Sequence, residues 1–400
     1  MLAGSTKQAC RAFRSRIRRH RDATVDKKPL AGSEAGHSSS NRPVTLHSGH
    51  LPMLLEAQHK EKIDNLTAKL KTAYAKSRKN HLKIVAERSA LIEKLQKILC
   101  TSNSSLVPVG SLANSFASTN DSDVDLFFLA ARNDLFWRDF DSHPNFKVAF
   151  MRTAADLLEQ SSEIELDAPC QLIVRSSIPL VVVKMKNRIS VDIQFPIWQD
   201  FQAIRNTNLI RHYVMADSRF GELYLWAKQL FTVQGARNSK QGLLSSYHIM
   251  LLVVHFLQCK HIFAEPVLPT LMRTHYDKVA PDAPIKQVVE LLKKPLEDQL
   301  EGWKSENKMS AGLLALKFID YYARFRPQDY SIDIGRGCVF RRRQTGFNDH
   351  LGIYDPYSPV SVCRSRLILP AFMSAVTATN AAMLNGKMID SYPNFEDRKP

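Results

Sequence analysis

Residues 120–126 read Asn-Asp-Ser-Asp-Val-Asp-Leu, and they lead into the apolar run Val124–Ala130. Alternate residues of a strand face the same side, so we expect Asp123 and Asp125 to project together. Two carboxylates on one face repel each other unless a cation lies between them, and Mg²⁺ prefers such oxygen ligands. The segment therefore predicts a strand that carries part of a metal site.

Two further segments extend this pattern. Gly110-Ser111 follows an apolar run, and there a glycine lets the backbone approach a phosphate that the serine hydroxyl can bind. In the segment 189–195, Ile-Ser-Val-Asp-Ile-Gln-Phe, the apolar residues alternate onto one face and leave Asp192 on the polar face. A third carboxylate on a neighbouring strand would complete the ligands for two metal ions, which together assist a displacement at phosphorus.

An EF-hand calcium loop is the main alternative for the acidic segment. Such a loop needs a glycine at its sixth position and a glutamate at its twelfth. Counted from Asp121, these positions hold Leu126 and Arg132, so the EF-hand interpretation fails. A turn rich in Asp and Asn would explain the Asp-Val-Asp motif alone, but it would not explain its combination with Gly110-Ser111 and Asp192.

The rest of the chain divides by composition and periodicity. Apolar residues recur at helical spacing from 54 to 99, and they return on helical faces at 219–233, 245–259, 312–325 and 365–384. Between them lie short β-like runs at 106–109, 124–130, 180–185 and 189–195. We therefore expect a disordered basic leader at 1–52, N-terminal helices packing on the helical domain at 53–100, a catalytic domain at 101–200, a helical domain at 201–390 and a tail at 391–400.

The net charge of the 400-residue chain is +16, and the excess is concentrated near its start. Residues 1–100 contain 21 Lys or Arg against 8 Asp or Glu. Clustered cations favour a nucleic-acid partner because they displace counterions from phosphates, although a solvated basic tail has the same composition. No apolar stretch reaches the ~20 residues of a membrane-spanning helix, so we expect no membrane partner. The 6 cysteines include no closely spaced pair, which excludes a zinc knuckle.

With these motifs the chain resembles the cytoplasmic poly(A) RNA polymerases of the germline-development type. These template-independent enzymes belong to the DNA polymerase β-like nucleotidyltransferase superfamily and are relatives of the terminal uridylyltransferases. The resemblance covers roughly residues 55–390 and rests, beyond the acidic motifs, on segments 204–207, 217–219, 242–258, 267–269 and 355–357. It implies an α+β fold, in which a mixed-sheet nucleotidyltransferase domain is inserted into or packed on a helical, PAP-associated central domain.

The resemblance also implies roles for individual residues. The catalytic and metal-binding residues would be Asp123, Asp125 and Asp192, with Mg²⁺ or Mn²⁺ as the cofactor. The nucleotide-binding residues would be Gly110, Ser111, Asn206, Thr207, Lys228, Ser246, Tyr247 and Asp355. Within this set, Asn206 and Thr207 would contact the ribose hydroxyls. Lys228 and Ser246 would contact the triphosphate, and Tyr247 would stack on the base.

Two departures from the family pattern bear on the nucleotide. Some members have a second lysine four residues after Lys228, where this chain has Thr232. Either Lys240 or another base would substitute for it, or the triphosphate would be held less tightly. Uridylyl-transferring relatives often carry an inserted histidine in the C-terminal motif, and segment 355–364 has none. The resemblance therefore implies transfer of AMP from ATP to an RNA 3′ end, with UTP as the alternative nucleotide.

Partners and other function classes follow from what the sequence lacks. No RNA-recognition motif or zinc finger is recognisable, so we expect a separate RNA-binding protein to select targets. An RNA-binding scaffold with an inactive site is the alternative from another class, but the intact set of three acids argues against it. A small-molecule nucleotidyltransferase is a further alternative, which the long helical region disfavours. We expect a cytoplasmic location, although the arginine-rich leader would also fit a nuclear signal or a mitochondrial presequence.

Overall fold

The computed structural model describes residues 51–118, 122–130, 134–176, 178–195, 201–342 and 349–395. The expected leader at 1–52 therefore lies almost wholly outside the described residues. Its last two positions belong to helix α2 (Leu51–Gln58). No helix in the described part of the chain is long and apolar enough to cross a bilayer.

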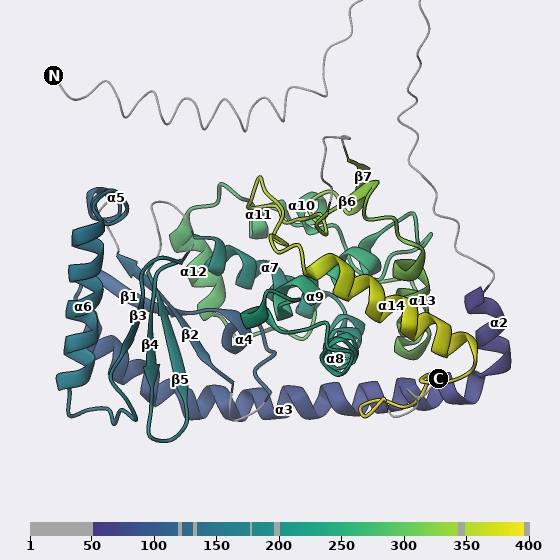
Figure 1. Ribbon diagram of the computed structural model, residues 1–400, viewed down its shortest axis with the longest axis horizontal. Helices are drawn as coiled ribbons and strands as arrows, with labels where there is room; N and C mark the ends of the chain where they lie inside the picture. Colours follow the sequence, from purple (N-terminus) through teal and green to yellow (C-terminus); the bar gives the residue numbers. More distant parts are fainter. Residues whose placement is uncertain are drawn as a thin grey trace, which may run out of the picture. The chain divides into compact units, whose positions relative to one another are not determined.

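The acidic segment lies in a mixed five-stranded sheet with the order β1-β2-β5-β4-β3 (Figure 1). The strands are β1 (Ser104–Pro108), β2 (Val124–Ala130), β3 (Gln171–Ile173), β4 (Leu180–Lys184) and β5 (Ser190–Gln194). Strands β2 and β5 run parallel, and the other neighbours pair antiparallel. The four β-like runs expected from the sequence are confirmed. The sequence analysis missed β3, because a strand of three residues is too short to show alternation.

The two faces of the sheet pack against different cores. Alternate residues of β2, Val124 and Leu126, are buried with α6 (Pro144–Gln160), which follows α5 (Asp134–Ser142). Phe127 lies on the opposite face, in a small core with residues of α7 (Gln202–Ala216) and α12 (Ile285–Lys293). Because side chains alternate along a strand, Asp125 shares the face of Phe127 and is directed toward the helical region.

The helical region contributes most of the largest core, and the expected helices are confirmed to within a few residues at their ends. Its further elements are α8 (Ser218–Val233), η2 (Ser239–Gln241), α9 (Ser246–Gln258), α10 (Leu271–Thr274), α11 (Tyr276–Val279), α13 (Ala311–Arg324) and α14 (Ile368–Leu384). A small sheet of β6 (Tyr330–Asp333), β7 (Cys338–Arg341) and β8 (Ile353–Tyr354) follows α13. This sheet was not expected, because its strands span at most four residues.

Helix α3 (Lys60–Leu99) packs against both large cores. Ile63, Leu66 and Leu70 lie in the helical core, whereas Ile84 and Leu95 lie in the core of the five-stranded sheet. Figure 1 shows α3 running past α8 and the sheet, and it contacts α8, α13, α6 and β1. The first half of α3 thus packs on the helical core, and its second half packs on the core of the sheet.

The expected tail at 391–400 begins inside the helical core. Phe395 is fully buried, and its ring meets that of Trp226 edge-on at 6.1 Å between centroids. A buried phenylalanine removes a large apolar surface from water, which explains why the chain stays packed beyond residue 390. Residues 396–400 lie outside the described range.

Candidate active site

Two of the three expected catalytic acids lie side by side. Asp125 of β2 and Asp192 of β5 are direct partners in the parallel pairing of the two strands. Burial raises the pKa of Asp125 to about 7, and the charges of Asp192 and Asp123 contribute. Burial and the charge of Asp123 also raise the pKa of Asp192. Asp123 itself is exposed immediately before β2. Strand alternation therefore places Asp125 and Asp192 as the sequence predicted.

The carboxylate of Asp125 occupies the space next to Gly110 that a side chain would need. The Gly110 φ of +64° lies in the left-handed region, and a Cβ atom there would stand 2.5 Å from Oδ2 of Asp125. A glycine is therefore required, because any side chain would collide with the acid. The sequence analysis expected this glycine to make room for a phosphate; the structure shows that it makes room for Asp125. Ser111, the next residue of the short helix α4 (Gly110–Ala113), is half-buried.

Thr207 fixes the Gly110 turn from the helical side. Its hydroxyl accepts a hydrogen bond from the backbone N–H of Gly110 at 3.0 Å and donates to the carbonyl of Ala203 at 2.6 Å. The residue is only 4% exposed. Since both bonds stay within the protein, the geometry does not support the expected contact of Thr207 with a ribose. The threonine instead ties α7 to the turn beside the acids.

Asn206, Tyr247 and Asp355 form a second cluster. The Tyr247 hydroxyl donates to Asp355 Oδ2 at 3.1 Å, and the Asn206 side chain also hydrogen-bonds to Asp355. Asp355 accepts two backbone N–H bonds, from Tyr357 and Ser358, at 2.9 Å. Burial nevertheless raises the pKa of Asp355. The structure thus brings these three predicted nucleotide-binding residues together from α7, α9 and the segment after β8.

The Asn206 side chain has one oxygen that is available to accept a hydrogen bond. Its Oδ1 is buried and has no partner among the described residues. A buried acceptor without a donor costs free energy, on the order of 1–3 kcal/mol, so such atoms usually await a ligand or a water. A ribose hydroxyl is a donor of the kind that this atom lacks.

The remaining two predicted residues lie together at the end of α8 and the start of α9. Lys228 is half-buried, and its Nζ lies 5.9 Å from the ring centroid of Tyr224. Ser246 begins α9 directly after its cap Ser245, and its hydroxyl accepts a hydrogen bond from Arg237 Nη2 at 3.2 Å. Arg237 was missed by the sequence analysis, which considered Lys240 by number and other bases only in general terms.

Lys240 lies toward the acids instead. It belongs to η2, is exposed, and its charge opposes the rise in the pKa of Asp192. The segment between α8 and α9 therefore contributes one cation beside Lys228 and another within electrostatic range of β5. This connects the cluster of acids with the cluster of nucleotide-binding candidates.

The donor chemistry of the acids fits a divalent cation. Asp125 and Asp192 are adjacent carboxylates whose repulsion a cation would relieve, and carboxylate oxygens are the ligands that Mg²⁺ and Mn²⁺ prefer. Within the described ranges, however, no group of three or more His, Cys, Asp or Glu side chains is arranged to hold a metal ion. Two acids are thus in place, and the inclusion of Asp123 in a common ligand set stays a prediction.

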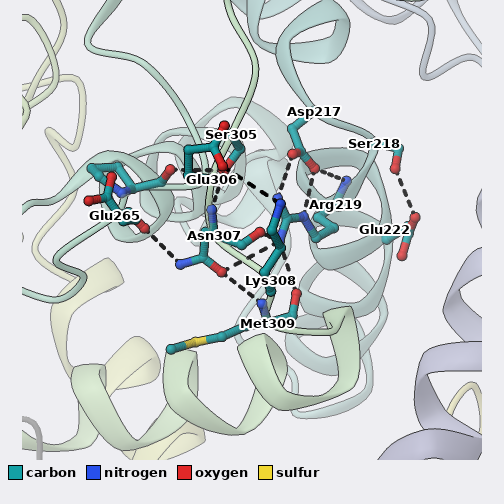
Figure 2. A network of polar contacts seen from close by, with 11 residues as sticks. Asp217, Ser218, Arg219, Glu222, Glu265, Ser305, Glu306, Asn307, Lys308 and Met309 are labelled. Carbon is teal, nitrogen blue, oxygen red and sulfur yellow. Dashed lines mark hydrogen bonds and ion pairs between the residues drawn. The ribbon is translucent and has the colours of Figure 1, made fainter.

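The Asp217-Ser218-Arg219 segment has an architectural role. Arg219 pairs with Asp217 at 2.7 Å and donates to the carbonyls of Asn307 and Met309 (Figure 2). A cavity of about 590 Å³ adjoins this network, and it is lined by none of the predicted site residues. The segment therefore anchors the start of α8.

Comparison with known proteins gives this geometry a context. Residues 66–215 match the family described as "Poly(A) RNA polymerase, mitochondrial-like, central palm domain". This range contains Gly110 and all three acids. "Poly(A) RNA polymerase GLD2" of Danio rerio is 28% identical over 351 residues, which are 84% of this chain and 67% of that protein. The chain is therefore similar to a GLD2 poly(A) RNA polymerase over most of its length.

Other relatives are matched over smaller shares of their length. "Poly(A) RNA polymerase gld-2" of Caenorhabditis elegans is 27% identical over 239 residues, 58% of this chain but 20% of that protein. The fly relative, "Poly(A) RNA polymerase gld-2 homolog A" of Drosophila melanogaster, is 30% identical over 189 residues, 45% of this chain and 13% of that protein. The chain thus spans a minor part of these two longer relatives.

Solved structures confirm the fold. The structure of a GLD-2/RNP-8 complex matches with a TM-score of 0.62 and 22% identity, covering 80% of this chain and 94% of that chain. A cytoplasmic RNA terminal U-transferase also matches with a TM-score of 0.62 and 22% identity, covering 86% and 100%. The expected α+β nucleotidyltransferase fold is therefore confirmed, and its mixed sheet is the one that carries Asp125 and Asp192.

Proposed function

We propose that this chain is a template-independent RNA adenylyltransferase, which transfers AMP from ATP to the 3′-hydroxyl of RNA and releases pyrophosphate. The homologous enzymes are named poly(A) RNA polymerases in fish, fly and nematode. The observation that carries the proposal is the adjacent pair Asp125 and Asp192, set against helix-borne nucleotide-binding candidates. Adjacent strand-borne carboxylates are what phosphoryl transfer with divalent cations needs.

The acids would act by charge and position. Asp123 and Asp125 would hold Mg²⁺ or Mn²⁺, and Asp192 would complete the ligand set and help to deprotonate the RNA 3′-hydroxyl. When bound, the divalent ions neutralise negative charge on the phosphates. The raised pKa values of Asp125 and Asp192 support this proposal, because the free site is short of positive charge.

The nucleotide would bind on the helical side of the acids. Tyr247, oriented by Asp355, offers its ring to the adenine. Oδ1 of Asn206 would accept a hydrogen bond from a ribose hydroxyl, which favours ATP over dATP if the bonded group is the 2′-hydroxyl. Lys228 and Ser246 would bind the triphosphate.

The remaining proposals concern the RNA acceptor, its selection and the location of the chain. The RNA 3′ end is the acceptor, and we propose that a separate RNA-binding protein chooses the target, as the solved complex of GLD-2 with RNP-8 suggests for this chain too. A cytoplasmic location is also a proposal, since the basic leader lies outside the described residues.

A 3′-extension assay tests the proposed function. The full chain is incubated with labelled oligo(A) RNA, Mg²⁺ and each NTP in turn. Asp192→Ala is compared with Asp167→Ala, because Asp167 is exposed and belongs to neither β2 nor β5. We expect a ladder with ATP that Asp192→Ala abolishes and Asp167→Ala keeps. A ladder with UTP alone would replace the adenylyl assignment by the uridylyl one. Unchanged extension by Asp192→Ala would refute the mechanism.

A further inference from the structure

Two cations lie together at the end of α8, and their only described side-chain hydrogen bonds are to hydroxyl groups. Burial and, to a smaller extent, the nearby charge of Arg237 lower the pKa of Lys228 to about 8, and no carboxylate opposes these effects. The guanidinium of Arg237 hydrogen-bonds only to hydroxyls in the described part of the chain. Like charges held together with little water are unfavourable unless an anion joins them. The pair therefore indicates a binding site for an anion.

The backbone after α8 fixes the place of Arg237. Gly235 has a φ of +69°, which turns the chain back on itself after the last turn of α8. The next residue, Ala236, is buried, and the N–H groups of Ala236 and Arg237 both donate to the Phe231 carbonyl, at 2.8 and 3.1 Å. The turn thus returns Arg237 to the side of α8 rather than leaving it on a free loop.

The guanidinium is held by two hydroxyls. Nη1 lies 3.4 Å from Oγ1 of Thr232, and Nη2 lies 3.2 Å from Oγ of Ser246. The Thr232 hydroxyl in turn donates to the Lys228 carbonyl at 2.7 Å. Nε of Arg237 is buried and has no partner among the described residues. Neutral hydroxyls orient a guanidinium but do not neutralise it, so the positive charge remains available to a ligand.

We propose that Arg237 is the second triphosphate-binding cation of this chain, beside Lys228. Thr232 lies one helical turn after Lys228, and Arg237 reaches this position from the following turn. A planar guanidinium can bind two phosphate oxygens at once, which an ammonium cannot. Thr232 acts as a positioning residue for Arg237. The inference rests on the proposed function for the identity of the anion as a nucleotide.

Lys240 is the competing candidate, and its position argues against it. It is exposed on η2 and lies near enough to Asp192 for its charge to lower the pKa of that acid. Lys240 is therefore assigned to the neighbourhood of the acids. Of the substitutes that the sequence left open, Lys240 thus lies toward the acids, whereas Arg237 lies beside Lys228.

The first experiment measures binding, so that it does not depend on turnover. Binding of unlabelled ATP to the full chain with Mg²⁺ is measured by isothermal titration calorimetry, and AMP, which lacks the β- and γ-phosphates, is measured in the same way. We expect Arg237→Gln to weaken ATP binding about ten-fold or more, and to change AMP binding less than about two-fold. Arg326→Gln is the matched control, because Arg326 is exposed and pairs with Asp329 after α13.

The second experiment moves the charge. Thr232→Lys added to Arg237→Gln should restore most of the ATP affinity, because the lysine lies one turn after Lys228. If the Arg237→Gln variant does not fold, the ATP affinity of the Thr232→Lys single variant tests the proposal by itself. In a site that already has its second cation, ATP affinity should change less than about three-fold, whereas a gain of about ten-fold or more would overturn the proposal.

The outcomes separate this inference from the proposed function. Equal weakening of ATP and AMP by Arg237→Gln, or no weakening of either, overturns the role of Arg237. Absence of RNA extension by the unmodified chain with all four NTPs contradicts the proposed function, while selective loss of ATP binding still supports Arg237. In the extension assay, the KM for ATP should rise more than kcat falls, because a positioning defect in the fold would lower kcat as well.

Discussion

The acids and the cations of the candidate site are positioned by two different kinds of structure. Asp125 and Asp192 occupy neighbouring positions of one strand pair, so a single register fixes both. Lys228, Arg237 and Ser246 come from a helix, a turn and the start of the next helix. The acids therefore depend on hydrogen bonds of the sheet, and the cations depend on how separate segments pack.

This difference predicts how substitutions of the acids and of the cations will affect the site. Strand register is strongly specified, because a slip of one residue would turn a whole apolar face outward. Changes to the acids should therefore remove chemistry without moving their neighbours. The cation half is built from separate contacts, so its changes should alter nucleotide affinity by graded amounts.

The largest effect is expected for Asp125→Asn. The substitution keeps the shape of the side chain but removes the charge that a divalent ion needs, so extension should fall by about 10³-fold or more. Initial rates with saturating ATP and oligo(A) RNA measure this loss. Asp167→Asn, an exposed acid outside the paired strands, should stay within about two-fold of the unmodified chain. Comparable losses in both variants would contradict a specific role for Asp125.

A loss of about 10²-fold is expected for Gly110→Ala. The added methyl group would lie 2.5 Å from Asp125 Oδ2, so the acid would have to move by a distance that catalysis does not tolerate. The control is Gly302→Ala, because Gly302 also has a positive φ, of +74°, but its nearest neighbour would be 3.9 Å away. Both variants bear the backbone strain, and only the first should lose most of its kcat. Similar kcat values for the two would mean that strain alone matters.

An intermediate effect of about ten-fold is expected for Thr207→Val, which tests the link between the halves. Valine removes the acceptor of the Gly110 N–H and leaves that group unpaired, at a cost of about 1–3 kcal/mol. Activity and melting temperature should both fall, and Thr207→Ser should keep both, because its hydroxyl retains the bond. A loss of ATP affinity without any loss of thermal stability would instead support the ribose contact.

The smallest effect concerns pH and Lys228. The free site holds the pKa of this lysine at about 8, so the amine loses its charge as the pH rises above that value. A triphosphate needs the charged form, and the KM for ATP should therefore rise several-fold between about pH 7.5 and 9. Lys228→Arg stays protonated throughout this range and should give a flat profile. A rise of equal size in Lys228→Arg would assign the pH dependence to another group.

The site residues that the sequence could predict lie on strands and helices, where residues repeat with a simple period. Alternation predicted Asp192 on the polar face of its strand, and the structure places this acid beside Asp125. The motif around Ser246 and Tyr247 marked the start of a helix, which is α9. Local spacing was sufficient because each of these residues lies within a regular element.

The unpredicted part depends on backbone turns and on long-range packing. Arg237 reaches Ser246 only because Gly235 takes a left-handed conformation, and one sequence does not show which glycine does so. Thr207 looked like a ribose contact until its hydroxyl was found on Gly110, 97 residues earlier in the chain. The partners of buried polar groups are set by tertiary structure, and periodicity carries no information about them.

Helix α3 fixes the rotation of its two ends relative to each other, because both ends are buried in large cores. Its 40 residues span about 60 Å, and its buried positions continue without a break from one large core to the other. One residue inserted near its middle, between Leu70 and Ile84, would rotate the second half by about 100° relative to the first. Leu66 could then keep its place only if Leu95 left its own. Loops can vary in length, but the residue count between these two leucines is fixed by the two cores at once.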